Sequence, residues 1–151
     1  MIPGNDMGDS LTTGLLDLLF LQIALGGVGD SSGLQPSATA GSFYVSLHVG
    51  APGRAGTQLT NETTVGGYAR LPVSRTGSGW ARVANSISNV AIMTFGQCTS
   101  GSQTVTHFVI GTESTGAGKL LVSAPLIASL LIVPPITPQF AAGSLIFVFE
   151  Q

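Results

Sequence analysis

Few stretches of this 151-residue chain place reactive side chains at a spacing that chemistry could use. The segment Gly29-Asp-Ser-Ser-Gly33 fits the G-x-S-x-G pattern that presents a nucleophilic serine. That pattern works when a strand feeds a strained turn that enters a helix, because the turn exposes the serine hydroxyl. Here the sequence predicts a helix before the segment and a flexible linker after it. We therefore expect no nucleophile at Ser31.

Ligands for a metal ion are equally sparse. The two histidines, His48 and His107, would have to converge with Cys98, Glu62 or Glu113 to hold zinc, and their spacing does not demand this. We interpret both histidines as hydrogen-bonded strand residues and Cys98 as a structural thiol. Because Cys98 is the single cysteine, no intrachain disulfide can form.

Two further patterns also lack what their chemistry requires. The segment Gly116-Ala-Gly-Lys119 resembles a phosphate-binding loop, but Glu113 and Leu120 stand where a glycine and a serine or threonine are needed. We interpret it as a hairpin turn. The carboxylates available for glycoside hydrolysis lie in linkers, turns or the C-terminus and form no matched pair: Asp30, Glu62, Glu113 and Glu150. The sequence thus predicts no catalytic residue, metal or cofactor, and no enzyme activity.

The composition points to a neutral surface. Hydrophobic residues make up 44% of the chain and charged residues only 8%, against about 25% charged in ordinary soluble domains. Such a surface loses little hydration free energy when another protein covers it, so the chain is either part of an assembly or a neutral, glycine-rich β domain. Five scattered basic residues and a net charge of −2 argue against nucleic acid and membrane surfaces as partners.

Residues 1–41 are expected to form an N-terminal arm, an apolar helix and a linker. Apolar residues recur at helical spacing from Leu11 to Leu25, after a possible cap at Asp9 or Ser10 and before Gly26-Gly27. The run is too short to span a membrane and is interrupted by Asp17. No basic residue precedes it, unlike a secretory signal. We therefore expect assembly in the cytoplasm without export, and a helix that packs on its own sheet or on a neighbouring subunit.

Residues 42–151 are expected to form one antiparallel β-sandwich domain. From Ser42 the period changes to two, with Phe43, Val45, Leu47 and Val49 on one face of a strand. Glycine- and proline-rich turns separate the later apolar segments. About eight strands at this spacing predict an all-β, jelly-roll-like sandwich; after the first strand they are Tyr68–Arg75, Trp80–Ala84, Ile87–Phe95, Thr104–Gly111, Lys119–Ala124, Leu130–Val133 and Ser144–Glu150.

Three groups of residues are candidates for contacts with a partner protein. They belong to the apolar helix, to the Pro52–Gly67 loop, which we expect to be long and exposed, and to a small aromatic and arginine cluster. The candidates are Leu15, Leu19, Phe20, Arg54, Asn61, Glu62, Tyr68, Arg70 and Trp80.

The chain resembles small virion structural proteins of tailed bacteriophages. The resemblance runs from Ser42 to Glu150 and rests on short segments in order. They are Phe43-Tyr-Val-Ser-Leu-His48 with Pro52-Gly53, Asn61-Glu62, Gly67-Tyr-Ala-Arg70, Val105-Thr-His-Phe108, Ile110-Gly-Thr112, Gly118-Lys-Leu-Leu121 and Ile136-Thr-Pro-Gln-Phe-Ala-Ala-Gly143. Members of this group are commonly labelled tail fibre, head decoration or cement proteins. The resemblance implies a structural role and provides no catalytic residues.

The resemblance leaves three roles open. We favour a cement protein on the capsid exterior that binds and stabilises the major capsid protein shell, together with copies of itself as a dimer or trimer. The helix that needs a partner, the low charge and the lack of a shaft motivate this choice. The first alternative is a tail fibre or tail adaptor protein. The second is a carbohydrate-binding sandwich, in which Tyr44, Tyr68 and Trp80 would line a groove with a carboxylate, or a glycan-cleaving one.

Overall fold

A computed structural model describes residues 7–149 of the chain. The described residues cluster into two compact units. The first unit takes residues 7–41, 74–91 and 141–149, and the second takes residues 42–73 and 92–140. Residues 74–91 and 141–149, which we expected in the same domain as the rest of residues 42–151, thus cluster with the N-terminal segment.

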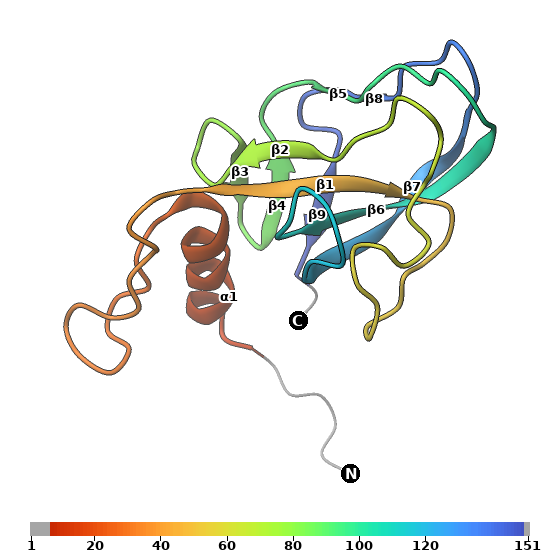
Figure 1. Cartoon of the computed structure of the whole chain (residues 1–151). Helices are drawn as coiled ribbons and strands as arrows, with labels where there is room; N and C mark the ends of the chain where they lie inside the picture. The colour runs from red at the N-terminus through yellow and green to blue at the C-terminus, as the bar shows by residue number, and fades with distance from the viewer. Residues whose placement is uncertain (1–6, 150–151) are drawn as a thin grey trace. The chain divides into compact units, whose positions relative to one another are not determined.

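The first unit joins a short helix to a three-stranded antiparallel sheet. Helix α1 (Asp9–Leu16) continues into a π-helical turn, η1 (Asp17–Leu21). Strands β3 (Trp80–Val83), β4 (Ser86–Asn89) and β9 (Ile146–Val148) pair in the order β3-β4-β9 (Figure 1). Ile87 lies at the centre of the sheet, opposite Arg82 on one side and Phe147 on the other.

We predicted that the helix would end at Gly26-Gly27, but it ends earlier, at Leu21. Gln22 adopts the left-handed conformation, with φ of 60°, and thereby stops the helical hydrogen bonds. Its amide Nε2 donates to the carbonyl oxygens of Thr39 and Ala40. The Arg75 guanidinium donates to the carbonyl oxygens of Leu18 and Leu19, which satisfies acceptors that every helix end leaves open. These long-range contacts decide where the helix ends, and the local sequence does not show them.

The apolar stripe of the helix packs on the sheet of its own unit. Leu16 is fully buried and Phe20 is 2% exposed. The Phe20 ring lies 5.1 Å from the Trp80 ring, edge to face, and 5.2 Å from the Phe147 ring. Asp17 accepts hydrogen bonds from the guanidinium of Arg82 on β3. Of the two packing partners that the sequence left open, the helix therefore uses its own sheet.

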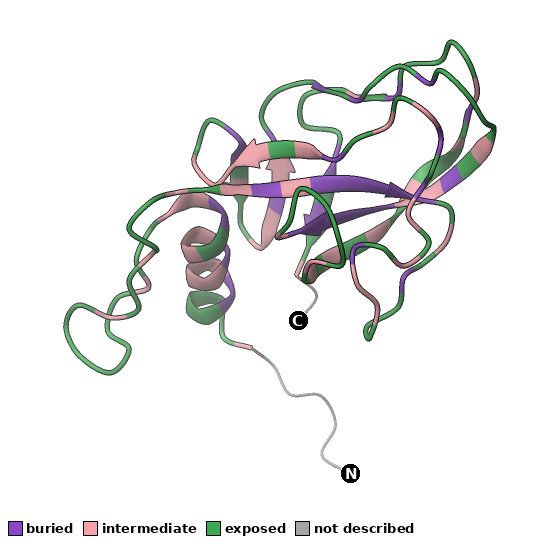
Figure 2. Cartoon of the chain, in the orientation of Figure 1, coloured by how far each residue is buried: buried purple, intermediate pink, exposed green. Residues whose placement is uncertain are grey.

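The second unit is built on a four-stranded antiparallel sheet. Strands β1 (Ser42–His48), β2 (Leu71–Ser74), β6 (Gln103–Gly111) and β7 (Leu120–Ile132) follow the order β2-β1-β6-β7. The short strands β5 (Met93–Thr94) and β8 (Gln139–Phe140) pair separately. Val45, Leu47, Val105, Val109 and Ile110 are fully buried, and Figure 2 shows that buried residues concentrate on β1 and β6.

The prediction of an all-β, antiparallel sandwich preceded by a short helix is confirmed, although several strand bounds differ. The expected strand Ile87–Phe95 is divided between β4 and β5, and the last strand is shorter, at Ile146–Val148. The two segments expected at Lys119–Ala124 and Leu130–Val133 belong to one strand, β7. Residues 126–129 of β7 bulge out opposite the single residue Thr106, because Val105 pairs with Leu130 and His107 with Pro125. Among residues 7–149, no helix is long and apolar enough to cross a membrane.

Candidate functional site

The site forms where the loop after β1 returns along that strand. The Val49 N–H donates to the Asn61 carbonyl over 2.8 Å, and the Thr63 N–H donates to the Leu47 carbonyl over 2.9 Å. Our prediction that the Pro52–Gly67 loop is exposed is therefore correct for only part of its length. The backbone bonds turn part of the loop inward, and its buried members are Pro52, Gln58, Thr63 and Val65.

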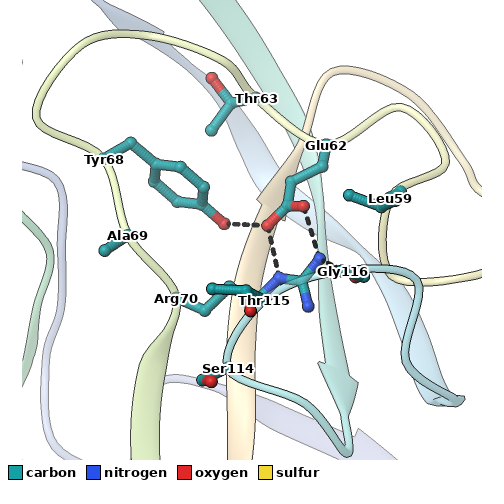
Figure 3. Close-up of a pocket in the computed structure, with 9 residues that line it drawn as sticks. All are labelled: Leu59, Glu62, Thr63, Tyr68, Ala69, Arg70, Ser114, Thr115 and Gly116. Carbon is teal, nitrogen blue, oxygen red and sulfur yellow. Dashed lines mark hydrogen bonds and ion pairs between the residues drawn. The ribbon is translucent and has the colours of Figure 1, made fainter.

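A bidentate ion pair lies at the centre of the site (Figure 3). The Arg70 Nε atom donates to Glu62 Oε1 and its Nη2 atom to Glu62 Oε2, each over 2.7 Å. The side chain of Arg70 is 3% exposed and that of Glu62 is 11% exposed. The Tyr68 hydroxyl donates to Glu62 Oε1 over 2.9 Å and accepts the Leu47 N–H over 3.0 Å. The Tyr68 hydroxyl thus connects the ion pair to Leu47, in the second half of β1.

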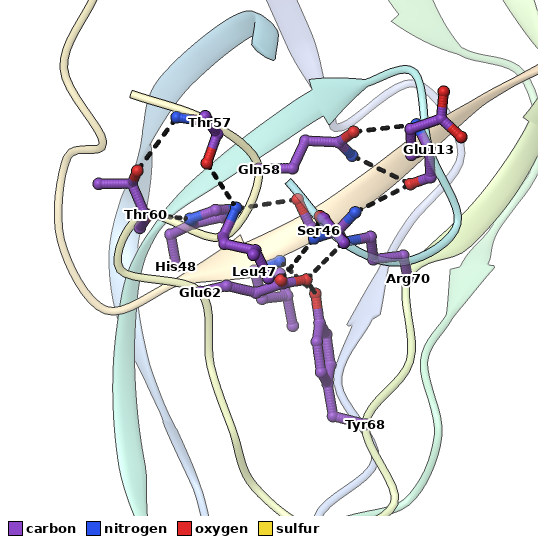
Figure 4. Close-up of polar contacts among 12 residues, drawn as sticks. Ser46, Leu47, His48, Thr57, Gln58, Thr60, Glu62, Tyr68, Arg70 and Glu113 are labelled. Atoms are coloured by element: carbon purple, nitrogen blue, oxygen red, sulfur yellow. Dashed lines mark hydrogen bonds and ion pairs between the residues drawn. The ribbon is translucent and has the colours of Figure 1, made fainter. Parts of the chain in front are cut away.

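Arg70 also holds the turn between β6 and β7. Its Nη1 atom donates to the Glu113 carbonyl over 3.0 Å, and its Nη2 atom to the Gly116 carbonyl over 2.8 Å. The buried Gln58 amide supports the same turn, accepting the Glu113 N–H over 2.9 Å. Figure 4 shows these contacts as one network that links the loop, β1 and the turn.

Two groups of the network, Arg70 and Tyr68, have raised pKa values. Hydrogen bonding to the Glu62 carboxylate raises the pKa of Arg70, and burial opposes this increase. Burial also raises the pKa of Tyr68 well above the usual value of a phenol, against the opposing effect of the Leu47 N–H. Arg70 therefore stays charged and Tyr68 stays protonated over the ordinary pH range.

A serine and a histidine meet next to this network. The His48 Nδ1 atom lies 2.8 Å from the Thr60 carbonyl oxygen, which can only accept, so Nδ1 carries the proton. The Ser46 hydroxyl then donates to Nε2 over 2.9 Å. The arrangement matches a nucleophile oriented by a base, but both residues are fully buried, which leaves no path for a substrate. Burial also lowers the pKa of His48, so the ring is neutral.

Among the other candidates for chemistry, His107 lies on β6 opposite His48, whereas Cys98 and Asp30 make local contacts in their own segments. The Nδ1 atom of His107 lies 2.8 Å from the hydroxyl of Thr106, and Cys98 is 2% exposed. In the linker, Asp30 Oδ1 accepts the N–H groups of Ser32 and Gly33, which makes a local turn without the strand and helix that a serine nucleophile needs. Within the part of the chain that the structure describes, no three His, Cys, Asp or Glu residues are grouped to hold a metal.

The predicted contact residues have three different fates. Glu62, Tyr68 and Arg70 come together in the network described above. Phe20 and Trp80 are buried in the first unit. The remaining candidates are at least partly exposed: Leu15, Leu19, Arg54 and Asn61.

Sequence reasoning missed the part that Gln58 plays. The glycines at the two ends of the β6–β7 turn, Gly111 and Gly118, are the sequence feature that could have indicated it. A Cβ atom at Gly111 would lie 2.1 Å from Gln58 Cδ, and one at Gly118 would lie 1.9 Å from Gln58 Oε1. Both positions therefore need glycine so that the glutamine can approach.

The network borders a surface pocket of about 280 Å³. Figure 3 shows Tyr68 and Leu59 on either side of the Glu62 carboxylate, with Ser114 and Thr115 close to Arg70. The residues that line the pocket come from the loop and the β6–β7 turn: Leu59, Glu62, Thr63, Tyr68, Ala69, Arg70, Ser114, Thr115 and Gly116. With its charged groups already paired, the pocket is suited to binding rather than to acid–base chemistry.

Residues 32–147, which include this whole site, match a family model described as "Podophage GP4 fiber I protein gp80". The match leaves out helix α1 and the turn η1. No curated protein matches the chain.

Proposed function

This chain belongs to the podophage GP4 fiber I protein gp80 family, and from that membership we propose that it serves in the tail fibre of a phage particle. The broader statement, that it is a virion structural protein of a bacteriophage, follows from the family itself. The match over residues 32–147 is the observation that carries the proposal. It supports the fibre alternative better than the cement role that we favoured from the sequence.

The packing of the helix removes one motive for the cement role. The cement role drew on a helix that needs a partner, and a neighbouring subunit was one of the two partners that we expected for it. Phe20 and Leu16 instead fill the core of the first unit, so the helix does not need a second protein to cover that stripe. Leu11, Leu19 and Ile23 remain exposed on or after it and are available to a partner.

The proposed role is structural and not catalytic. The buried position of Ser46 and His48 and the paired state of Glu62 and Arg70 support this reading. Other fibre subunits and further copies of the chain are the partners we propose. Nucleic acid and membrane surfaces remain unsupported by a chain with five scattered basic residues.

Immunogold labelling of intact virions tests the proposal. Antibodies against the purified protein should label the tail and leave the head free, while antibodies against the major capsid protein label the head in the same preparation. Gold on the head alone would exclude the fibre role and restore the cement role. Absence from purified particles would exclude both.

A further inference from the structure

The pocket between the loop and the β6–β7 turn has the form of a small binding site. Its volume of about 280 Å³ corresponds to roughly nine water molecules at liquid density, which suits one sugar-sized ring that remains partly exposed. The Glu62–Arg70 pair lines it while staying almost covered. Leu59 and Ala69 are exposed and give it apolar surface.

The charges of the pocket select against ionic ligands. Glu62 and Arg70 neutralise each other through two short hydrogen bonds. Hydrogen bonds occupy every nitrogen of the guanidinium, with Nη2 donating twice. An anion or a cation would lose hydration here without gaining an unpaired opposite charge. A neutral ligand does not have this cost.

The hydrogen-bonding groups that remain open suit hydroxyl groups. Within residues 7–149, the hydroxyls of Ser114 and Thr115 have no hydrogen-bond partner, although both line the pocket. Each can donate and accept. Glu62 Oε2 accepts one hydrogen bond, from Arg70, and a carboxylate oxygen can accept a second. The pocket thus combines these two hydroxyls and a carboxylate oxygen with the apolar surface of Leu59 and Ala69, and a sugar ring offers hydroxyl and C–H groups to both.

We propose that this pocket binds a neutral monosaccharide unit of a glycan. The second of our sequence-based alternatives placed such a site on Tyr44, Tyr68 and Trp80. The structure instead buries Trp80 in the first unit and brings Tyr68 together with Glu62 and the β6–β7 turn. Because the network is ordered by protein contacts alone, little conformational entropy is lost on binding. The proposal is independent of the place of the chain in the virion.

Titration of the ¹⁵N-labelled full-length protein with neutral monosaccharides, followed by amide chemical shifts, tests this inference. The panel is glucose, galactose, mannose, rhamnose and N-acetylglucosamine. At least one should cause saturable shifts at Leu59, Ala69 and residues 114–116. Glucuronate and glucosamine, which add a charge to a similar ring, should bind more weakly. If no neutral sugar saturates, or if a charged analogue binds more tightly than every neutral sugar, the inference is overturned.

Two variants locate the site. Ser114→Ala with Thr115→Ala removes two hydroxyls that have no protein partner and should weaken binding by about tenfold, the effect of two lost hydrogen bonds. Ser129→Ala, on the exposed bulge of β7, is the matched control and should bind as the parent does. Ala69→Gln should fill the pocket and abolish the shifts. Unchanged affinity in the folded double variant would place the sugar elsewhere and refute the assignment.

Discussion

The residue pair Glu62 and Arg70 supports the position of the loop along β1, together with Tyr68 and the backbone hydrogen bonds. Glu62→Gln preserves the shape of the side chain but leaves the Arg70 charge, which is 3% exposed, without its counter-ion. Breaking a buried pair from one side costs about 3 to 5 kcal/mol, and the glutamine retains part of the hydrogen bonding. We therefore expect the free energy of unfolding, measured in urea, to fall by about 2 to 4 kcal/mol.

Glu113→Gln is the matched control for this prediction. The Glu113 carboxylate makes no ion pair among residues 7–149; its backbone makes the hydrogen bonds of the network, and its charge raises the pKa of Arg70 less than Glu62 does. Its substitution should change the free energy of unfolding by less than about 0.5 kcal/mol. Equal losses in the two variants would mean that removal of a negative charge, and not the pairing with Arg70, explains the effect.

His48 should make stability depend on pH. Its folded pKa is lowered by burial, so the unfolded chain, with a histidine pKa of about 6.5, binds the proton first. The contribution is complete above about pH 6.5 and is lost as the pH falls below that value. His48→Gln should flatten the decline of the unfolding free energy between about pH 7.5 and pH 5.5. The same decline in parent and variant would contradict this.

At the scale of elements, helix α1 and the turn η1 should be part of the folded core of the first unit. Phe20 contacts Trp80 and Phe147 at ring distances of 5.1 and 5.2 Å. Phe20→Ala should therefore cost about 3 to 5 kcal/mol of unfolding free energy. Leu11→Ala, at a residue 43% exposed on the same helix, should cost less than about 1 kcal/mol. If the helix were a free clamp, thermal unfolding would not distinguish the two variants.

Strand β1 and the loop beside it illustrate how much of the site could be predicted from the sequence. The alternation in Phe43–Leu47 predicted β1 and its core face, because that pattern is local. It did not reveal that Ser46 and His48 on the other face are buried too, since the cover comes from a loop more than ten residues away in sequence. Glu62, Tyr68 and Arg70 were each identified as contact candidates. Their mutual pairing depends on the backbone bonds that return the loop to Leu47 and Val49, and no local pattern shows those bonds.

At the scale of the whole molecule, composition and family agree on an assembly. Only 8% of the residues are charged, and a neutral surface loses little hydration when a neighbouring subunit covers it. The matched family is described as a phage fiber protein, which supports the fibre role proposed above. The sequence alone could not choose between head and tail, because a neutral surface suits contact with either.

Phage particles made without this protein should separate the two structural roles at this scale. If the chain serves in the tail fibre, such particles should keep filled heads that withstand heating as well as parental heads do, and should lack density at the tail in electron micrographs. A cement protein has the opposite signature, because its binding free energy stabilises the shell and its loss lowers the temperature at which heads release DNA. Complementation with the full chain should restore the tail density. Heads that open at lower temperature while tails remain complete would contradict the fibre proposal.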